Sequence, residues 1–345
     1  MDDEARSPGD GASKGDPGPA QPAPSNAATV GMVSLGCPKN LVDGEVMLGR
    51  LQEAGHRLVA EPSEADVIVV NTCAFIDRAK QESVDTILEM AREKELGHAQ
   101  RLVVTGCLTQ RYDAELRKEI PEIDATLGTG QVEDVVRAVS GESTSLAEAP
   151  GAPTWVYDHT APRVLSTAPW LAYLKISEGC DYTCSFCIIP TLRGRHRSRH
   201  VEDILAEARD LAEGGAREIV LVAQDSTRFG LDHGIRDGLA YLLRRLGRIE
   251  GIRWIRVMYA YPGYVTDRLI EVMGASQQIL PYLDIPLQHA HPSALRRMRR
   301  PANIDWMFRT IEKMRSRIPD LALRTTYIVG SPGETEEGFH SLLEV

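Results

Sequence analysis

Short apolar runs and amphipathic stretches alternate along the chain from residue 30 to about residue 140. Three of these runs are short and rich in valine, as buried parallel strands are: residues 30–35, 66–70 and 101–105. Apolar positions at helical spacing follow them, and the expected helices cover residues 42–54, 76–94, 110–118 and 132–139. A shorter strand is expected at residues 125–127. Strand–helix alternation of this kind predicts a parallel, doubly wound α/β sheet of the flavodoxin or Rossmann type.

The same alternation resumes near residue 170 and continues to the last residues of the sequence. The expected strands are residues 172–176, 218–222, 254–258, 283–286 and 323–329. The expected helices are residues 201–213, 237–249, 265–274, 293–298, 306–317 and 334–344. A repeated β–α unit closes naturally into an open or partial barrel, and catalytic groups in such barrels lie at the carboxyl ends of the strands. We therefore expect a second α/β domain whose site lies at those strand ends.

Two stretches of different composition divide the chain. Residues 1–29 contain no Val, Leu, Ile or aromatic residue and are rich in Pro, Gly, Ala and Ser, which predicts a disordered tail. Residues 141–169 hold four prolines among small polar residues and are interpreted as a linker, with a short β segment at residues 154–157. The predicted organisation is a tail (1–29), a first domain (30–140), a linker (141–169) and a second domain (170–345).

The overall composition excludes some classes of function. Hydrophobic residues make up 43% of the 345 residues, enough for two packed cores. The formal net charge of −10 argues against non-specific binding to nucleic-acid phosphates. No apolar run is long enough to span a bilayer, and no signal peptide is recognisable. We expect a cytoplasmic protein without a membrane partner, whose six cysteines serve metal binding or catalysis rather than disulfides.

Three of the cysteines, Cys180, Cys184 and Cys187, lie within eight residues, directly after the first strand expected in the second domain. Soft thiolates suit iron–sulfur chemistry, and a loop with this spacing can hold three irons of a [4Fe-4S] cluster. The fourth iron then lacks a protein ligand and stays open to an exchangeable one. A zinc site, a disulfide cluster and packed free thiols are the alternatives. A structural zinc usually takes four protein ligands, and no nearby His or fourth Cys completes that set.

The other three cysteines, Cys37, Cys73 and Cys107, each follow one of the three valine-rich strands. The carboxyl ends of parallel strands meet at one edge of a sheet, where ligands bind. The three thiols are therefore expected to converge and to hold a second three-cysteine iron–sulfur cluster, again with one iron lacking a protein ligand. Three buried, inert thiols are the alternative, because Cys is among the most buried residue types.

Polar residues and a glycine follow other strands of the second domain, and a basic run follows its cysteines. Four residues could contact a cofactor or substrate, or could cap a helix or shape a turn: Gln224, Asp225, Gln288 and Gly330. Alternating arginines could anchor a carboxylate or phosphate, or could form a solvated basic strand: Arg193, Arg195, Arg197 and Arg199. No aromatic stacking platform accompanies the basic run, which disfavours a role in nucleic-acid binding.

The cysteine loop at residues 180–187, with the glycine turn at Gly179 before it, resembles the signature of radical S-adenosylmethionine enzymes. The resemblance implies a cluster whose open iron binds S-adenosylmethionine and whose electron cleaves that cofactor to a 5′-deoxyadenosyl radical. It makes Cys180, Cys184 and Cys187 the catalytic cysteines. It also places the S-adenosylmethionine pocket at the strand ends that carry Gln224, Asp225, Gln288 and Gly330.

Three segments of the first domain resemble the amino-terminal domain of methylthiotransferases, which insert a methylthio group at an unactivated C–H bond: residues 34–40, 71–75 and 105–110. The sequence Cys-Pro-Lys-Asn at residues 37–40 is similar to the branch that modifies an aspartate of small-subunit ribosomal protein twelve. Branches that act on transfer RNA typically carry Gln or another residue after this cysteine. Members of the family continue through another barrel strand and a small carboxy-terminal β-barrel, so the chain is expected to be carboxy-terminally truncated.

The resemblance implies two [4Fe-4S] clusters and S-adenosylmethionine as cofactors, and a flavodoxin- or ferredoxin-type protein as electron donor. One cluster would make the radical, and the other would present a sulfur that is first methylated and then taken up by the substrate carbon. A free carbon radical reacts indiscriminately, so the interface between the two domains is the expected active site. Two alternatives stay open: a transfer-RNA adenosine methylthiotransferase with the same chemistry, and a non-catalytic iron–sulfur electron carrier.

Overall fold

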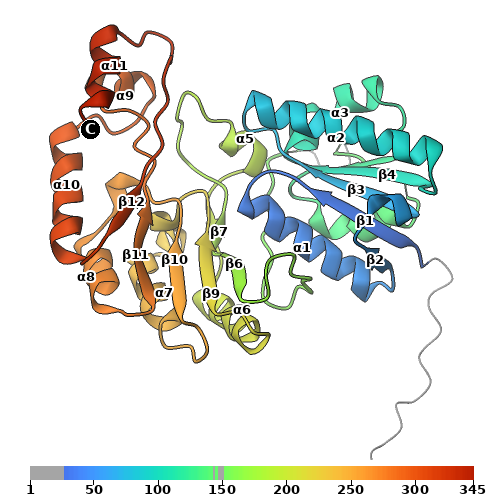
Figure 1. Ribbon diagram of the computed structural model, residues 1–345, viewed down its shortest axis with the longest axis horizontal. Coiled ribbons are helices and arrows are strands. Elements are labelled where there is room, and N and C mark those ends of the chain that lie inside the picture. The colour runs from blue at the N-terminus through green and yellow to red at the C-terminus, as the bar shows by residue number, and fades with distance from the viewer. Residues whose placement is uncertain (1–26, 143, 147–150) are drawn as a thin grey trace, which may run out of the picture.

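The computed structural model describes residues 27–142, 144–146 and 151–345. It contains two α/β units that lie side by side, the first formed by the blue-to-green part of the chain and the second by the part from light green to red (Figure 1). Residues 1–26 of the predicted disordered tail lie outside the described residues. Within the described part of the chain, no helix is both long and apolar enough to cross a membrane.

The first unit is built on a five-stranded parallel sheet with the order β2-β1-β3-β4-β5. Its strands are β1 (Thr29–Ser34), β2 (Arg57–Val59), β3 (Val67–Thr72), β4 (Arg101–Gly106) and β5 (Ala125–Leu127). This is the strand order of flavodoxin-like sheets, and the strand order reverses between β1 and β3, where such folds bind ligands. The prediction of a doubly wound parallel sheet is confirmed.

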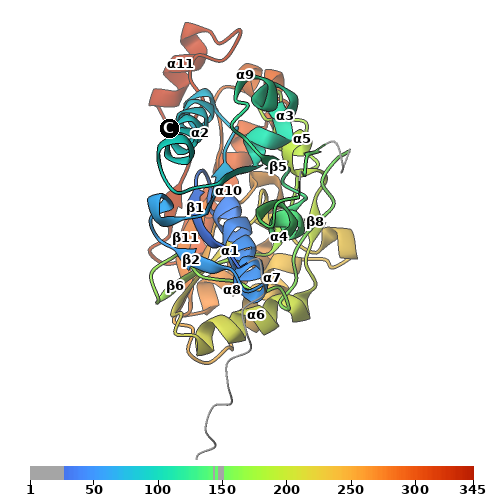
Figure 2. The same cartoon turned by 90° about the vertical axis from the view of Figure 1, so that its right-hand side faces the viewer.

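Helices cover both faces of this sheet. On one face lie α1 (Pro38–Glu53) and α4 (Val135–Val139), and on the other lie α2 (Asp77–Leu96) and α3 (Cys107–Glu119) (Figures 1 and 2). Because both faces are covered, β3 is buried along its whole length. Short 3-10 turns occur in both units: η1 (Pro62–Glu64), η2 (Val132–Asp134), η4 (Ser226–Arg228), η5 (Leu231–His233) and η6 (Pro262–Tyr264).

The second unit is an open barrel of five parallel strands with the order β12-β11-β10-β9-β6. The strands are β6 (Leu171–Lys175), β9 (Glu218–Val222), β10 (Trp254–Val257), β11 (Ile279–Asp284) and β12 (Ala322–Arg324). The helices are α6 (Val201–Glu213), α7 (Gly238–Leu246), α8 (Asp267–Ala275), α9 (Pro292–Arg297), α10 (Ile304–Arg317) and α11 (Glu336–Leu343). Each new strand is added on the same side, so β6 stays at the edge beside the first unit and meets α1 there (Figures 1 and 2). The predicted partial barrel is confirmed.

Several short elements are not evident from the sequence. The edge strand β2, the hairpin of β7 (Ser177–Glu178) and β8 (Arg197–Ser198), and the helix α5 (Ile189–Arg193) are too short to show an apolar period. The expected strand to residue 329 is wrong, since β12 ends at Arg324. The β segment expected at residues 154–157 is also wrong: this described stretch pairs with no strand. Its Tyr157 is instead buried beneath the Arg199 guanidinium, which lies 4.2 Å from the ring centroid.

Residues 151–169, from the predicted linker, include a stretch that packs against α1. The buried carboxylate of Glu45 accepts hydrogen bonds from the Arg163 guanidinium (2.6 and 2.9 Å) and from the backbone N–H and hydroxyl of Ser166 (both 2.8 Å). Arg163 also donates to Glu207 of α6 at 2.6 Å. The segment therefore fastens α1 of the first unit to the barrel.

Asp66 connects the start of β1 to β3 and yields a stability prediction. Its carboxylate accepts hydrogen bonds from the backbone N–H (2.8 Å) and the hydroxyl (2.7 Å) of Thr29, and these bonds lower the pKa of Asp66. Their stabilisation is complete above the unfolded-state pKa of about 3.9 and is lost as the pH falls through the lower folded-state pKa. We expect Asp66→Asn to lower the free energy of unfolding by about 1–2 kcal/mol at pH 7 and by less at pH 3.

Urea denaturation at the two pH values measures this difference. The control is Asp85→Asn, because Asp85 is an exposed residue of α2 and should show little effect at either pH. An equal loss of stability for Asp66→Asn at pH 3 and pH 7 would contradict the assigned role of the charge.

Candidate active site at the domain interface

Cys37, Cys73 and Cys107, called the sheet cysteines below, converge at the carboxyl edge of the first sheet. Cys37 precedes α1, Cys73 follows β3 and Cys107 begins α3. The loop after β1 packs directly against the loop after β3. A Cβ atom at Gly36 would lie 2.7 Å from the Cβ of Cys73 and 3.1 Å from its Sγ. Gly36 also has a φ of +92°, so this position requires glycine for both reasons.

The sheet cysteines differ in pKa because their surroundings differ. Burial raises the pKa of Cys107 to about 11 and also raises that of Cys73, and neighbouring thiols add to both shifts. Burial acts in the same direction on Cys37. The Lys39 ammonium, the Arg193 guanidinium and backbone N–H groups of α1 nevertheless bring the pKa of Cys37 below its ordinary value. Cys37 is therefore the thiol of this set that most readily becomes a thiolate ligand.

Cys180, Cys184 and Cys187, called the loop cysteines below, lie between β7 and α5, beyond the carboxyl end of β6. The three half-buried thiols line a cavity of about 580 Å³, together with Tyr182 and other residues of the loop. Burial raises the pKa of Cys180 to about 11 and raises that of Cys187, and neighbouring thiols add to both shifts. A cavity of this size can hold a cofactor of several hundred Å³ beside the thiols.

Both sets fit iron–sulfur clusters better than single metal ions. All six cysteines are free thiols. In neither cysteine set do the three sulfur atoms all lie within 4.8 Å of one another. Among the described residues, the group of three metal-ligating side chains that meets this limit is Asp158, His159 and Asp203. A tetrahedral zinc with bonds of about 2.3 Å would hold its sulfurs about 3.8 Å apart, whereas a cluster spreads its thiolates over separate irons. The ligand roles of the six cysteines stay a prediction, which this spacing supports.

A buried network of charged side chains joins the two units behind the cysteines. Lys175 of β6 forms ion pairs with Asp43 of α1 and with Glu178 of β7, the latter at 2.7 Å. Arg193, the last residue of α5, pairs with the same two carboxylates and donates to the Asn40 side chain at 3.0 Å. All five side chains are more than nine-tenths buried. Two cations thus balance two carboxylates across the interface, as buried charges require.

Arg193 also reaches the sheet cysteines. Its guanidinium donates to the Sγ of Cys107 at 3.6 Å. Pro190 and Thr191, nearer the start of α5, line the cavity of the loop cysteines. A five-residue helix is about 7.5 Å long, so one short helix connects the cavity of the loop cysteines to the sheet cysteines.

One signal in the sequence points to this network. Lys175 is a charged residue inside an otherwise apolar strand, and a charge in such a place needs a buried partner. The partner could not be identified, because Asp43 lies 132 residues away in the chain. The role of Glu178, three residues after Lys175, has no separate signal.

The alternating arginines differ in their surroundings. Arg193 and Arg199 are buried and paired with carboxylates, so the interpretation as a solvated basic strand is wrong for these two. Arg195 is exposed and lines the cavity of the loop cysteines, and Arg197 is half-buried.

Gln224 and Asp225 follow β9 and lie behind the cysteine loop. Gln224 donates to Glu178 at 2.5 Å, and its own buried carbonyl oxygen has no partner in the described chain. Such an orphaned acceptor fits a site that a ligand completes. Asp225 caps η4 through Thr227 and accepts from the Tyr182 hydroxyl at 2.9 Å, so both carboxylate oxygens bond within the chain. Asp225 thereby fixes the cysteine loop to the barrel.

Gln288 and Gly330 lie beyond the last two barrel strands, and both have positive φ, +73° and +76°. The backbone of Gln288 pairs with the segment after β12, and its left-handed conformation is a strained one of the kind found at ligand sites. Gly330 is exposed and donates its N–H to Glu334, which also contacts His289 at 3.0 Å. These contacts favour a turn-shaping role for Gly330. Contacts of S-adenosylmethionine with Gln224, Asp225, Gln288 and Gly330 stay predictions.

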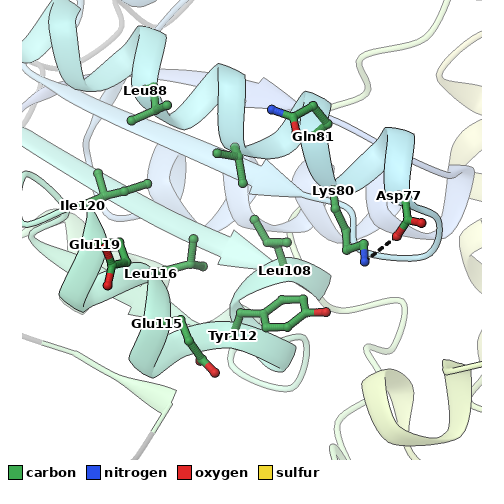
Figure 3. A pocket seen from close by; sticks show the side chains of 11 residues that line it. Asp77, Lys80, Gln81, Leu88, Leu108, Tyr112, Glu115, Leu116, Glu119 and Ile120 are labelled. Carbon is green, nitrogen blue, oxygen red and sulfur yellow. Dashed lines mark ion pairs between the residues drawn. The ribbon is translucent and has the colours of Figure 1, made fainter.

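A separate groove of about 610 Å³ lies between α2 and α3 (Figure 3). Apolar side chains such as Leu88, Leu108 and Leu116 line it, and the ion pair of Asp77 and Lys80 (2.6 Å) stands at one end. None of the six cysteines lines this groove. The chemistry-bearing residues therefore gather at the interface of the two units and not here.

The fold and the two cysteine sets define a radical S-adenosylmethionine enzyme. The chain matches the radical SAM superfamily over residues 174–345 and the uncharacterized protein family UPF0004 over residues 29–128. It is 49% identical to the ribosomal protein uS12 methylthiotransferase RimO of Koribacter versatilis and 50% identical to that of Pelotomaculum thermopropionicum. Each match covers 91% of this chain and 71% of the relative. The chain belongs to the RimO family of ribosomal protein uS12 methylthiotransferases.

Solved structures share the fold. The radical S-adenosylmethionine methyltransferase TsrM from Kitasatospora setae, with cobalamin and a [4Fe-4S] cluster bound, has a TM-score of 0.65 at 14% identity. That match covers 92% of this chain and 72% of TsrM. The cobalamin-dependent radical enzyme OxsB has a TM-score of 0.54 at 13% identity, over 88% of this chain and 49% of OxsB. At these identities the likeness concerns the fold alone.

Proposed function

We propose that the protein attaches a methylthio group to an aspartate of ribosomal protein uS12. The observation that carries the proposal is the pair of three-cysteine sets that α5 connects. Insertion of sulfur at an unactivated carbon needs a radical source and a sulfur source at one place, because a bound geometry must direct the radical. The named relatives, which are 49% and 50% identical to this chain over 91% of its length, are uS12 methylthiotransferases.

The two cysteine sets have distinct roles in this proposal. The loop cysteines hold a [4Fe-4S] cluster with S-adenosylmethionine in the adjoining cavity, and the sheet cysteines hold a second [4Fe-4S] cluster. When bound, these cofactors supply the radical that removes hydrogen from the substrate and the sulfur that replaces it. The half-buried position of the loop cysteines on an open cavity suits access by a flavodoxin- or ferredoxin-type electron donor.

The chain's own residues position these groups. Asp225 holds the cysteine loop through the Tyr182 hydroxyl, and Gln224 offers its unpartnered carbonyl oxygen as an acceptor. Arg193 keeps the sheet cysteines at a fixed separation from the loop cysteines, since it is anchored on α1 through Asp43. The network behind them is itself buried, so water does not reach the site from that side.

Mass spectrometry on cells with and without the gene tests the proposal. Digested small-subunit ribosomal proteins and transfer RNA are analysed in parallel. We expect loss of a methylthio-aspartate peptide of uS12 in the cells that lack the gene, with unchanged nucleosides. Loss of a methylthio-adenosine instead would favour the transfer-RNA alternative, and no change in either would contradict the proposal. Conversion of S-adenosylmethionine to 5′-deoxyadenosine by the purified protein with dithionite would contradict the electron-carrier alternative.

A further inference from the structure

One cation at the interface, Lys39, forms no ion pair with a carboxylate of the described chain. Lys39 lies in the first turn of α1, two residues after Cys37, and is 7% exposed. Within the described part of the chain, its ammonium forms no ion pair with a carboxylate and no hydrogen bond. Its Nζ instead lies 3.5 Å from the centroid of the Tyr259 ring. The Lys39 side chain is therefore largely buried, and its ammonium lies against an aromatic face and acts on the Cys37 thiol, whose pKa it lowers.

The other buried cations at this place are paired. Lys175 and Arg193 share the carboxylates of Asp43 and Glu178, so no acid of the network is left for Lys39. The Nζ of Lys39 is not among the fully buried polar atoms that lack a partner, so it stays accessible beside the Tyr259 ring. The ammonium of Lys39 is thus suited to an anion that comes from outside the chain.

The surroundings of Lys39 belong to both units. Tyr259 follows β10 of the barrel, so the contact between Lys39 and Tyr259 crosses the interface. Tyr259 has a φ of +61°, which aromatic residues rarely adopt and which is typical of ligand sites. At the next strand end, the buried Asp284 pairs with Arg324 at 3.2 Å rather than with Lys39. The ammonium therefore lies at the carboxyl ends of both sheets, where substrates bind.

We propose that Lys39 binds the side-chain carboxylate of the aspartate that is modified, and that this ion pair makes the enzyme specific for an acidic residue. The inference rests on the proposed function. In aspartate the β-carbon is bonded directly to the carboxylate carbon, so an ammonium that fixes the carboxylate also fixes the carbon that receives the sulfur. The Lys39 ammonium acts electrostatically on the Cys37 thiol, so a carboxylate on Lys39 would bring that carbon near the sheet cysteines. A nucleobase offers no such negative charge to the ammonium.

Binding measurements on Lys39 variants test this inference. The probes are purified uS12 and its variant in which the modified aspartate is replaced by Asn, titrated against the cluster-loaded protein without S-adenosylmethionine. We expect the wild type to bind the aspartate form at least about tenfold more tightly than the asparagine form. Lys39→Met should bind both forms with the same Kd, and Lys39→Arg should keep most of the preference. The control is Lys118→Met, because the Lys118 side chain is 80% exposed.

Two results would overturn the inference. One is an undiminished preference of Lys39→Met for the aspartate form. The other is an equal loss of affinity for both forms that leaves their ratio unchanged, because Lys39 would then only support the fold. Lys39→Gln serves as a second replacement where the methionine variant does not fold. Failure of the proposed function would be seen in a different measurement. In that case mass spectrometry would find no methylthio group that the wild-type protein has added to uS12.

Discussion

The Cys73→Ala variant is expected to cleave S-adenosylmethionine at close to the wild-type rate but to transfer no methylthio group, while Cys184→Ala is expected to do neither. Cys73 follows β3 in the first sheet, away from the cavity that Cys184 lines. Loss of a thiolate ligand should reduce the affected reaction by about a hundredfold or more. Two assays separate the effects: formation of 5′-deoxyadenosine with dithionite, and methylthio-uS12 by mass spectrometry.

Ser185→Ala is the matched control for Cys184→Ala. Ser185 lines the same cavity, but its hydroxyl donates to the backbone carbonyl of Arg297 at 3.0 Å. This variant should keep both activities within a few-fold of the wild type. Iron content gives an independent readout, because each cysteine variant should retain about four of about eight irons. Methylthio transfer by Cys73→Ala at the wild-type rate would show that the sheet cysteines do not supply the sulfur.

The positions of the cysteines in the fold could be predicted from the apolar pattern. β3 and β4 are almost wholly buried, so their valine-rich runs stand out, and their ends agree with the expected ones within two residues. Cys73 and Cys107 come directly after those ends, and the rule for parallel sheets then brings them together. Two other elements, β9 and α6, have the bounds that the sequence predicts.

The buried charges could not be predicted, because burial at an interface depends on how two units meet. The residues around Arg193 alternate between charged and other types, which is typical of an exposed strand. The strand β8 nevertheless has only two residues, and the arginine enters the interface from α5. Likewise, the sequence places Lys39 two residues after Cys37 but does not show what its ammonium contacts. The contact of its ammonium with Tyr259 is visible only when the barrel lies beside α1.

Arg193→Met is expected to lower the free energy of unfolding by about 3–5 kcal/mol, because it leaves two buried carboxylates with one cation. Lys175 alone would then face Asp43 and Glu178 across the interface. The variant also loses the contact with the Sγ of Cys107, so methylthio transfer should fall far more than cleavage of S-adenosylmethionine. Anaerobic urea denaturation and the two activity assays measure these effects.

Two further variants separate the charge balance from the size of the side chain. Adding Asp43→Asn to Arg193→Met leaves Lys175 opposite Glu178, so the network is again neutral and a substantial part of the lost stability should return. Arg195→Met removes an arginine side chain that is 89% exposed and should change the free energy of unfolding by no more than about 0.5 kcal/mol. If Arg193→Met were as stable as Arg195→Met, the network would not hold the two units together. If cleavage of S-adenosylmethionine fell as much as methylthio transfer, Arg193 would support the loop cysteines. It would then not serve to hold the sheet cysteines close to them.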